Sequence, residues 1–230
     1  YGVVAKINPF NHPLRFCAEK SASALAAGNT VVMKASEQAP LSSLRFSEIC
    51  HEVLPPGVVN VLTGGIACGQ AMVRHPDVRR VGVVGSVSTG KSIAKDAAED
   101  LTHVTLELGG KNPVIIFPDV DPKEAASFAI KGMNMIRQGQ SCSSTSRVFV
   151  HQNIQNEVIE ELKVLIEKLP VGLPWIESNE VGPIVSQRQY DKIMDFISSA
   201  GREGATLVSG GGSPNDELLS NGFFIQPTIF

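Results

Sequence analysis

The chain has 230 residues and a net charge of −3, and its composition is 43% hydrophobic and 19% charged. This composition excludes a disordered chain, and the acidic balance argues against a nucleic-acid or anionic-membrane partner. No apolar run approaches the ~20 residues that a membrane span needs. The four cysteines form no Cys-x-x-Cys pair and the five histidines lack metal-ligand spacing, so we expect a reducing, cytoplasmic location and no metal.

The two ends of the chain are both strand-like. Residues 2–7 open the chain without an initiating methionine, and residues 227–230 close it. We therefore expect the sequence to be an excerpt of a longer polypeptide. A natural full-length protein with a mass of 24.5 kDa would contradict this expectation.

Short apolar strands alternate with helices over the first hundred residues. This alternation predicts an α/β fold with a doubly wound parallel sheet. Gly28 and Asn29 provide a stop for the first helix. The expected strands are residues 3–7, 30–33, 58–62, 81–84 and 104–108, and the expected helices are residues 14–27, 41–53, 69–75 and 86–99.

A glycine pair, Gly109 and Gly110, interrupts the alternation and predicts a domain boundary. We expect one domain at residues 1–109 and a second α/β domain at residues 110–230. Asp121 is a candidate N-cap for a helix, with Pro122 in its first turn. The expected strands of the second domain are 114–117, 147–151, 206–209 and 223–229, and its helices 125–136, 157–169 and 186–200.

The strongest candidate for a reactive group is Cys142. It lies in a small polar run, Arg137-Gln138-Gly139-Gln140-Ser141-Cys142-Ser143-Ser144, between a helical and a strand-like pattern. A cysteine acts as a nucleophile when its thiolate is favoured and the site is partly open. The alternative is a small buried hydrophobe, which is the usual state of a free cysteine. The polar surroundings favour the nucleophile.

Two further segments are candidates for nucleotide binding. The run from Gly85 through Ser86 to Gly90 follows a strand and opens a helix, whose N-terminus suits an anion. A tight strand-to-helix turn would have the same pattern, because the run lacks the usual dinucleotide or P-loop fingerprint. Lys34 and Glu37 follow another strand, where ligands bind in open α/β sheets. Without further support, a solvated charged turn is the favoured interpretation of these two residues.

Two polar residues are candidates for acid-base and oxyanion chemistry. Glu107 lies between two leucines at a strand end, where an apolar setting raises a carboxyl pKa toward neutrality. The alternative is an exposed glutamate on an edge. Asn11 lies in a proline-bounded turn before a helix, where its side chain can cap the helix or donate to a developing oxyanion. The local sequence does not choose between these roles.

Together these segments resemble the aldehyde dehydrogenase superfamily, and the resemblance covers the whole chain. Each motif alone is modest, but five in the family's order are a specific signal. The separation of 142 − 107 = 35 residues between the glutamate and the cysteine fits as well. The motifs are Pro-Phe-Asn-His-Pro, Lys-Ala-Ser-Glu after a strand, Gly-Ser-x-x-x-Gly, Glu-Leu-Gly-Gly-Lys and Gly-Gln-x-Cys.

The resemblance implies a role for each candidate. Cys142 is the implied nucleophile, Glu107 the general base, and Asn11, with the backbone N–H of Cys142, the oxyanion hole. The implied activity is oxidation of an aldehyde to an acid with NAD(P)⁺ through a cysteine thioester that Glu107-activated water hydrolyses. The cofactor contacts would come from Lys34, Glu37, Gly85, Ser86 and Leu108. Glu37 favours NAD, since its charge would oppose a 2′-phosphate, while Lys34 leaves NADP open.

The sequence also departs from the family pattern. Arg137 stands where many members have asparagine, Phe10 replaces tryptophan, and Val83-Val84 replaces a Phe-Thr pair. The family's N-terminal portion and its Glu-x-Phe-Gly-Pro motif are not in the 230 residues, so we expect the chain alone to be poorly active. The resemblance further implies a homodimer or homotetramer in the full-length protein. The alternatives are a CoA-acylating relative and a catalytically silent remnant.

Overall fold

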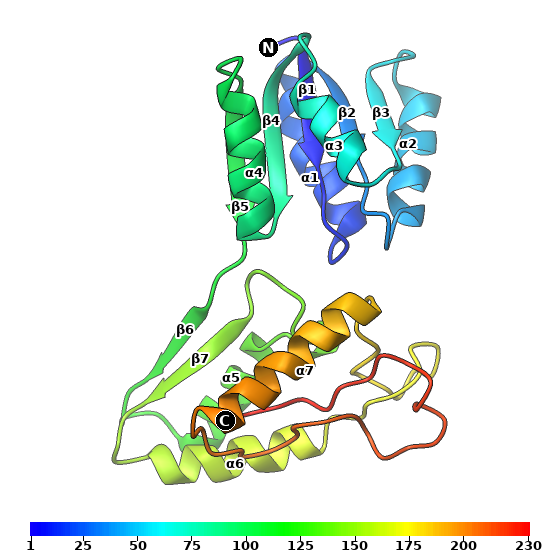
Figure 1. Ribbon diagram of the computed structural model, residues 1–230. Coiled ribbons are helices and arrows are strands. Elements are labelled where there is room, and N and C mark those ends of the chain that lie inside the picture. The colour runs from blue at the N-terminus through cyan, green and yellow to red at the C-terminus, as the bar shows by residue number, and fades with distance from the viewer. The chain divides into compact units, whose positions relative to one another are not determined.

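The computed structural model describes residues 1–230 and divides the chain into two compact units, Tyr1–Gly109 and Gly110–Phe230. Each unit is described by itself below (Figure 1). The mixed α/β architecture agrees with the fold class expected from the sequence. No helix is both long enough and apolar enough to cross a membrane.

The first unit is built on a five-stranded parallel sheet with the order β3-β2-β1-β4-β5. The chain therefore extends the sheet from β1 through β2 to β3, and then returns to place β4 and β5 on the other side of β1. This reversal makes the carboxyl ends of β1 and β4 the topological switch point. The strands are β1 (Val3–Ile7), β2 (Thr30–Lys34), β3 (Val59–Leu62), β4 (Val78–Gly85) and β5 (His103–Leu108).

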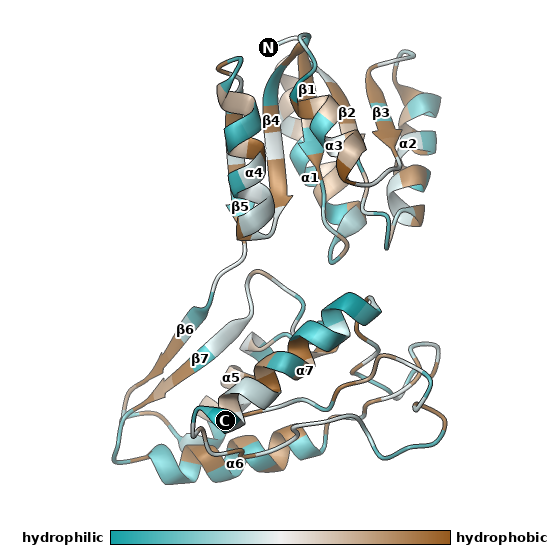
Figure 2. Ribbon diagram, in the orientation of Figure 1, coloured by the Kyte–Doolittle hydropathy of each residue, from teal (hydrophilic) through white to brown (hydrophobic).

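Helices cover both faces of this sheet, as the alternation predicted. In β1, Val4 packs with residues of helices α1 and α2, whereas Ala5 and Ile7 pack with residues of α3 and α4. Figure 2 shows the strands as largely hydrophobic and the helices as mixed, which is the pattern of a sheet buried on two sides. The helices are α1 (Pro13–Ala26), α2 (Leu41–Val53), α3 (Ile66–Val73) and α4 (Val87–Ala98).

The second unit has a two-stranded parallel sheet whose inner face forms the core. Its inner side chains, such as Ile116, pack with α5 and α6. Asp121 caps α5, because its Oδ1 accepts a hydrogen bond of 3.0 Å from the Glu124 N–H. The elements are β6 (Asn112–Ile116), α5 (Pro122–Gly132), a 3₁₀ helix η1 (Met135–Arg137), β7 (Thr145–Val150), α6 (Gln155–Glu167) and α7 (Gln187–Arg202).

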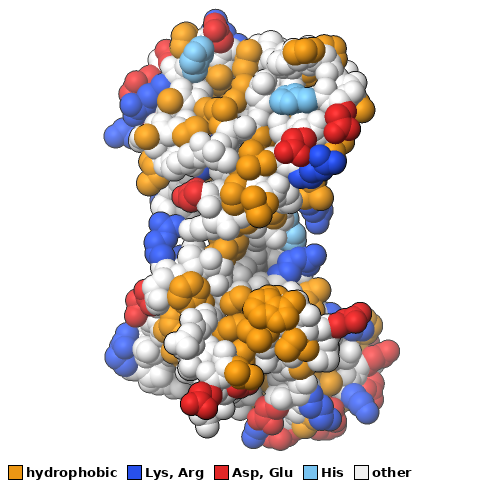
Figure 3. All heavy atoms as spheres, turned by 90° about the vertical axis from the view of Figure 1, so that its right-hand side faces the viewer, with side chains coloured by type: hydrophobic (Ala, Val, Ile, Leu, Met, Phe, Trp, Pro, Cys, Tyr) orange, Lys and Arg blue, Asp and Glu red, His pale blue; other side chains and the backbone are white.

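The outer face of the second sheet is apolar and exposed. Ile115 of β6 pairs with Phe149 of β7, and their exposed fractions are 63% and 51%. Helix α7 has no buried residue. Figure 3 shows a further group of apolar side chains on a different side of this unit, the side that faces right in Figure 1. Large exposed apolar residues of the unit include Ile115, Phe117, Phe128, Ile136, Phe149, Trp175, Phe196 and Leu218.

Three sequence expectations are wrong in the second unit. Residues 206–209 and 223–229 are not strands, because only an isolated antiparallel bridge joins Ser209 to Ile229. Gly210 turns the chain there with φ +80°, and Pro227 has no N–H for a ladder. The helix expected over 125–136 ends at Gly132, since Asn134 takes a left-handed conformation with φ 55°.

Candidate active site

The first unit brings seven of the eight predicted site residues to one edge of its sheet. Because all five strands are parallel, the segments that follow them emerge at the same edge. Asn11 follows β1, Lys34 and Glu37 lie at the end of β2, Gly85 and Ser86 at the end of β4, and Glu107 and Leu108 at the end of β5. This edge is where ligands bind in doubly wound sheets.

Lys34 and Glu37 form an ordered pair. The Lys34 Nζ donates to Glu37 Oε2 at 3.2 Å and to the Ala35 carbonyl at 3.1 Å. Lys34 is buried, whereas Glu37 is exposed. The pair is therefore held in place, unlike a freely solvated charged turn, and it presents a carboxylate to solvent beside a fixed ammonium.

Ser86 begins helix α4. Its Oγ accepts a hydrogen bond of 3.2 Å from the Thr89 N–H and lies 2.9 Å from the hydroxyls of Ser88 and Thr89. Helix α4 approaches the end of β5 closely at Gly90, where an added Cβ would lie 2.7 Å from Leu108 Cδ2. The result is a small-residue helix N-terminus at the edge of the sheet, as an anion site requires.

Glu107 is exposed on this unit, which is the alternative considered for it, and the apolar setting is not found. Strand alternation explains this exposure, because Leu106 and Leu108 point to the sheet face opposite to that of Glu107. The carboxylate lines a small cavity together with Lys6, Asn8 and Lys20.

Asn11 does not cap the following helix, which corrects one of the two roles considered for it. The N-cap position of α1 is His12, without a side-chain cap hydrogen bond, and Pro13 occupies the first turn. Proline has no N–H, so one of the groups that a cap would satisfy is missing. Asn11 is half-buried in the turn at the edge of the sheet.

Cys142 is the one exposed cysteine of the chain; Cys17 and Cys50 are buried and Cys68 is intermediate. The loop before it turns through left-handed residues at Asn134, Gln138 and Gly139. Burial, with a further contribution from Cys17, raises the pKa of the Cys50 thiol and disfavours its thiolate. The exposed position leaves Cys142 accessible to a reactant.

Asn112 holds the Cys142 loop, and the sequence interpretation did not identify it. Its Nδ2 donates to the Cys142 carbonyl at 2.7 Å and to the Ser144 carbonyl at 3.1 Å. Gln140 also anchors the loop, because its Oε1 accepts from the Val185 N–H at 3.3 Å. The only signal in the sequence is that Asn112 directly follows the Gly-Gly-Lys segment at a strand start.

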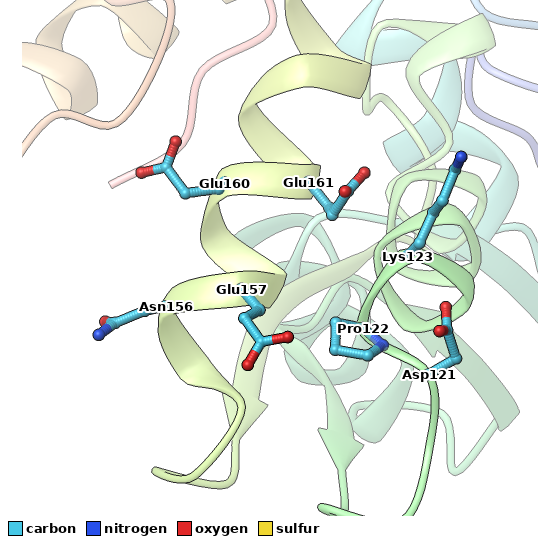
Figure 4. A pocket seen from close by; sticks show the side chains of 7 residues that line it. All are labelled: Asp121, Pro122, Lys123, Asn156, Glu157, Glu160 and Glu161. Atoms are coloured by element: carbon cyan, nitrogen blue, oxygen red, sulfur yellow. The ribbon is translucent and has the colours of Figure 1, made fainter.

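A surface hollow of the second unit is separate from the Cys142 loop. It lies between the first turns of α5 and α6 (Figure 4). These helices start where β6 and β7 end, whereas the Cys142 loop leads into the start of β7, so the two lie at opposite ends of the sheet. No group of metal-binding side chains is formed there or elsewhere in the chain. Its lining is Asp121, Pro122, Lys123, Asn156, Glu157, Glu160 and Glu161.

Comparison with known proteins decides the family. The model of the aldehyde dehydrogenase family matches residues 1–230. The chain belongs to this family. It is 46% identical over 233 residues to aldehyde dehydrogenase tropH of Talaromyces stipitatus, and 44% identical over 230 residues to a betaine aldehyde dehydrogenase of Rhizobium johnstonii. Both alignments cover 100% of this chain and 45% and 47% of those relatives.

Solved structures give the same fold. Betaine aldehyde dehydrogenase betB from Staphylococcus aureus, in complex with NAD⁺, matches with a TM-score of 0.95 and 38% identity. The match covers 99% of this chain and 45% of that one. The chain thus spans about half the length of the relatives it matches. In this aldehyde dehydrogenase chain, the candidate nucleophile belongs to one unit, and the candidate base and oxyanion donor to the other.

Proposed function

We propose that the full-length protein is an NAD⁺-dependent aldehyde dehydrogenase that releases a carboxylic acid. The observation that carries the proposal is the exposed Cys142 in a loop fixed by Asn112, in a chain that matches the family over its whole length. The first unit is then the cofactor domain and the second the catalytic domain, each in part. A small-molecule aldehyde is the substrate.

The chain's own residues divide the reaction into acylation and deacylation. The Cys142 thiolate adds to the aldehyde carbonyl, and the Asn11 amide and the Cys142 backbone N–H stabilise the resulting oxyanion. Loss of a hydride from the carbonyl carbon of this adduct gives a thioester on Cys142. Glu107 then accepts a proton from water, which attacks the thioester and releases the acid and the free thiolate.

The residues of the first unit fit a dinucleotide. A bound NAD⁺ would supply the acceptor for the hydride that the thiohemiacetal loses. The Glu37 carboxylate can accept from a ribose hydroxyl while Lys34 holds it, and the α4 N-terminus at Ser86 suits the pyrophosphate. Leu108 would add an apolar side chain to this site, and Gly85 would add its backbone. The negative charge of Glu37 disfavours the 2′-phosphate of NADP, although Lys34 beside it would offset part of that effect.

Rapid mixing of the full-length protein with NAD⁺ and a generic aldehyde tests the proposal, with wild type beside Glu107→Gln. The wild type should form NADH continuously, whereas the variant should form about one equivalent and stop, because its thioester persists. If product formation by the wild type required CoA, the thioester would be transferred to CoA and not hydrolysed. No NADH with any aldehyde, together with slow labelling of Cys142 by a thiol reagent at neutral pH, would indicate a silent remnant.

The location and assembly also remain proposals. A cytoplasmic location and a homodimer or homotetramer fit the composition and the family. Relatives with 46% identity include chloroplastic and peroxisomal enzymes, so localisation of the tagged full-length protein is the direct test, and light scattering tests the assembly.

A further inference from the structure

Two glutamines of the Cys142 loop reach a distant segment of the second unit. Gln138 and Gln140 are half-buried, and their side chains contact residues 181–185. The Gln140 Oε1 accepts a hydrogen bond of 3.3 Å from the Val185 N–H, which is 45 residues further along the chain. The part of the loop that precedes Cys142 is therefore tied to a segment with which no local pattern connects it.

The Gln138 amide is oriented with its oxygen toward Gly182. In this orientation it accepts from the Gly182 N–H at 3.0 Å and donates to the Arg137 carbonyl at 3.1 Å. The reverse orientation would bring two N–H groups together at one contact and two oxygens together at the other, so neither contact would be a hydrogen bond. In either orientation the amide lies 3.1 Å from that of Gln140, so the two glutamines are in contact.

The segment 181–185 is a firm support for these contacts. Val181 and Ile184 are buried, with exposed fractions of 2% and 4%. The Val181 N–H donates to the Pro170 carbonyl at 3.0 Å, and the Ile184 N–H donates to the Phe223 carbonyl at 2.8 Å. The segment is thus fixed to two other parts of the unit before the glutamines reach it.

The glutamines satisfy the remaining backbone donors of this segment. Pro183 has no N–H, which leaves the N–H groups of Gly182 and Val185, both in half-buried residues. Gln138 accepts from the first and Gln140 from the second. Backbone N–H groups that are withdrawn from water need a partner. Loss of either amide would therefore remove the partner of a backbone donor as well as a contact of the loop.

The glutamines and Asn112 hold the Cys142 loop at different points. Asn112 donates to the carbonyls of Cys142 and Ser144, which lie at and after the thiol-bearing residue. Gln138 and Gln140 precede that residue by four and two positions. The backbone on both sides of the thiol is consequently fixed by side-chain amides.

We propose that Gln138 and Gln140 are positioning residues for Cys142, because their amides seat its loop on the backbone of residues 181–185. The inference rests on the proposed function and deepens it, since it adds a distant segment to the groups that orient the nucleophile. A nucleophile that is displaced by a fraction of an ångström or misaligned attacks more slowly, even when it remains accessible.

The first test is the rate of the NADH burst in the full-length protein at saturating aldehyde and NAD⁺. Gln140→Met keeps the size of the side chain but removes the acceptor, so the burst should slow about fivefold to tenfold. NAD⁺ affinity should stay unchanged. Gln140→Glu keeps an acceptor oxygen for the Val185 N–H and should recover most of the rate. Gln152→Met, which changes an exposed glutamine of the same unit, should match wild type.

Gly182→Ala tests the same contact from the other partner. An added Cβ would lie 3.2 Å from the Gln138 amide nitrogen position, so it should displace the amide without altering the loop sequence. The burst should slow in the same direction as in Gln140→Met. Gly201→Ala is the matched control, because an added Cβ there meets no atom within 4 Å, and its burst should be that of wild type.

Three results would overturn the positioning role. They are a burst within twofold of wild type in both Gln140→Met and Gly182→Ala, a burst in Gln140→Glu as slow as in Gln140→Met, and an equal slowing in Gly201→Ala. A wild type that forms no NADH would instead refute the proposed function, so the two failures are distinct.

Discussion

The two units of the chain differ in how they bury their sheets. In the first unit, five parallel strands lie between helices on both faces, and each face has its own apolar cluster. In the second, two parallel strands have one apolar cluster, and the opposite face is exposed at Ile115 and Phe149. Parallel sheets in proteins are normally covered on both faces. Residues of the first unit therefore cover both faces of its sheet, whereas residues of the second unit cover only one face.

This difference matters for the chemistry that each unit is proposed to perform. The self-covered first unit presents the candidate binding groups and the proposed base at one edge of a packed sheet. The second unit presents the proposed nucleophile on a loop that two hydrogen bonds from Asn112 hold. Since the chain spans about half the length of its relatives, we infer that residues of the other half cover the outer face of β6 and β7. Substitutions at three places, Asn11, the adjacent Ile115 and Ile116, and Asn112, separate these contributions.

Asn11→Ala in the first unit should have the largest effect. Removing one oxyanion donor costs on the order of 10²- to 10³-fold in rate, so the NADH burst of the full-length protein should slow by that factor. NAD⁺ affinity should stay unchanged, because the Lys34–Glu37 pair is untouched. Single-turnover NADH formation and an NAD⁺ titration measure the two quantities.

Asn60→Ala is the matched control, since it removes an asparagine of β3 whose side chain bonds only its own turn, at the Gly57 carbonyl. It should leave the burst rate as in wild type. A burst in Asn11→Ala within fivefold of wild type would mean that Asn11 makes no contact with the oxyanion.

The adjacent isoleucines of β6 test the covering of the second sheet. In the 230-residue chain, Ile116→Ala should lower the free energy of unfolding by about 2–4 kcal/mol, because Ile116 is buried. Ile115→Ala should cost less than about 0.5 kcal/mol, since Ile115 is 63% exposed. Urea unfolding followed by tryptophan fluorescence reports on this unit alone, because Trp175 is the only tryptophan.

In the full-length protein the two substitutions should become similar in cost, as the outer face would then be buried. An Ile115→Ala variant that remains neutral in the full-length protein would contradict the inferred covering of β6 and β7.

The sequence predicted the first unit better than the second for a physical reason. Strands of a buried parallel sheet are short apolar runs between helices, so β1 and α2 were predicted with the observed ends. The segments around Ser209 and Ile229 are apolar as well, but a strand also needs a partner along its length, and here the contact is one bridge. Local pattern cannot show whether that partner exists.

The site shows the same limit. Cys142 could be selected from its polar neighbours, and Lys34 and Ser86 from their positions after strands. Glu107 is exposed and not in an apolar setting, because strand alternation places its two leucine neighbours on the other face of the sheet. Asn112 was missed because its two hydrogen bonds reach 30 and 32 residues along the chain, and no local pattern records such a contact.

Asn112→Ala should slow catalysis less than Asn11→Ala. It removes two hydrogen bonds that orient the Cys142 loop, each worth about 1 kcal/mol net, so acylation should slow by about tenfold to thirtyfold while NAD⁺ affinity is unchanged. Asn112→Asp should be slower still, because an isosteric carboxylate would face two carbonyl oxygens. Burst kinetics and the rate of Cys142 labelling by a thiol reagent measure the effect. Asn153→Ala, an exposed asparagine of the same unit, should match wild type. If Asn112→Asp were as fast as wild type, contacts other than the two Asn112 hydrogen bonds would hold the Cys142 loop. The proposed nucleophile would then keep its position without Asn112.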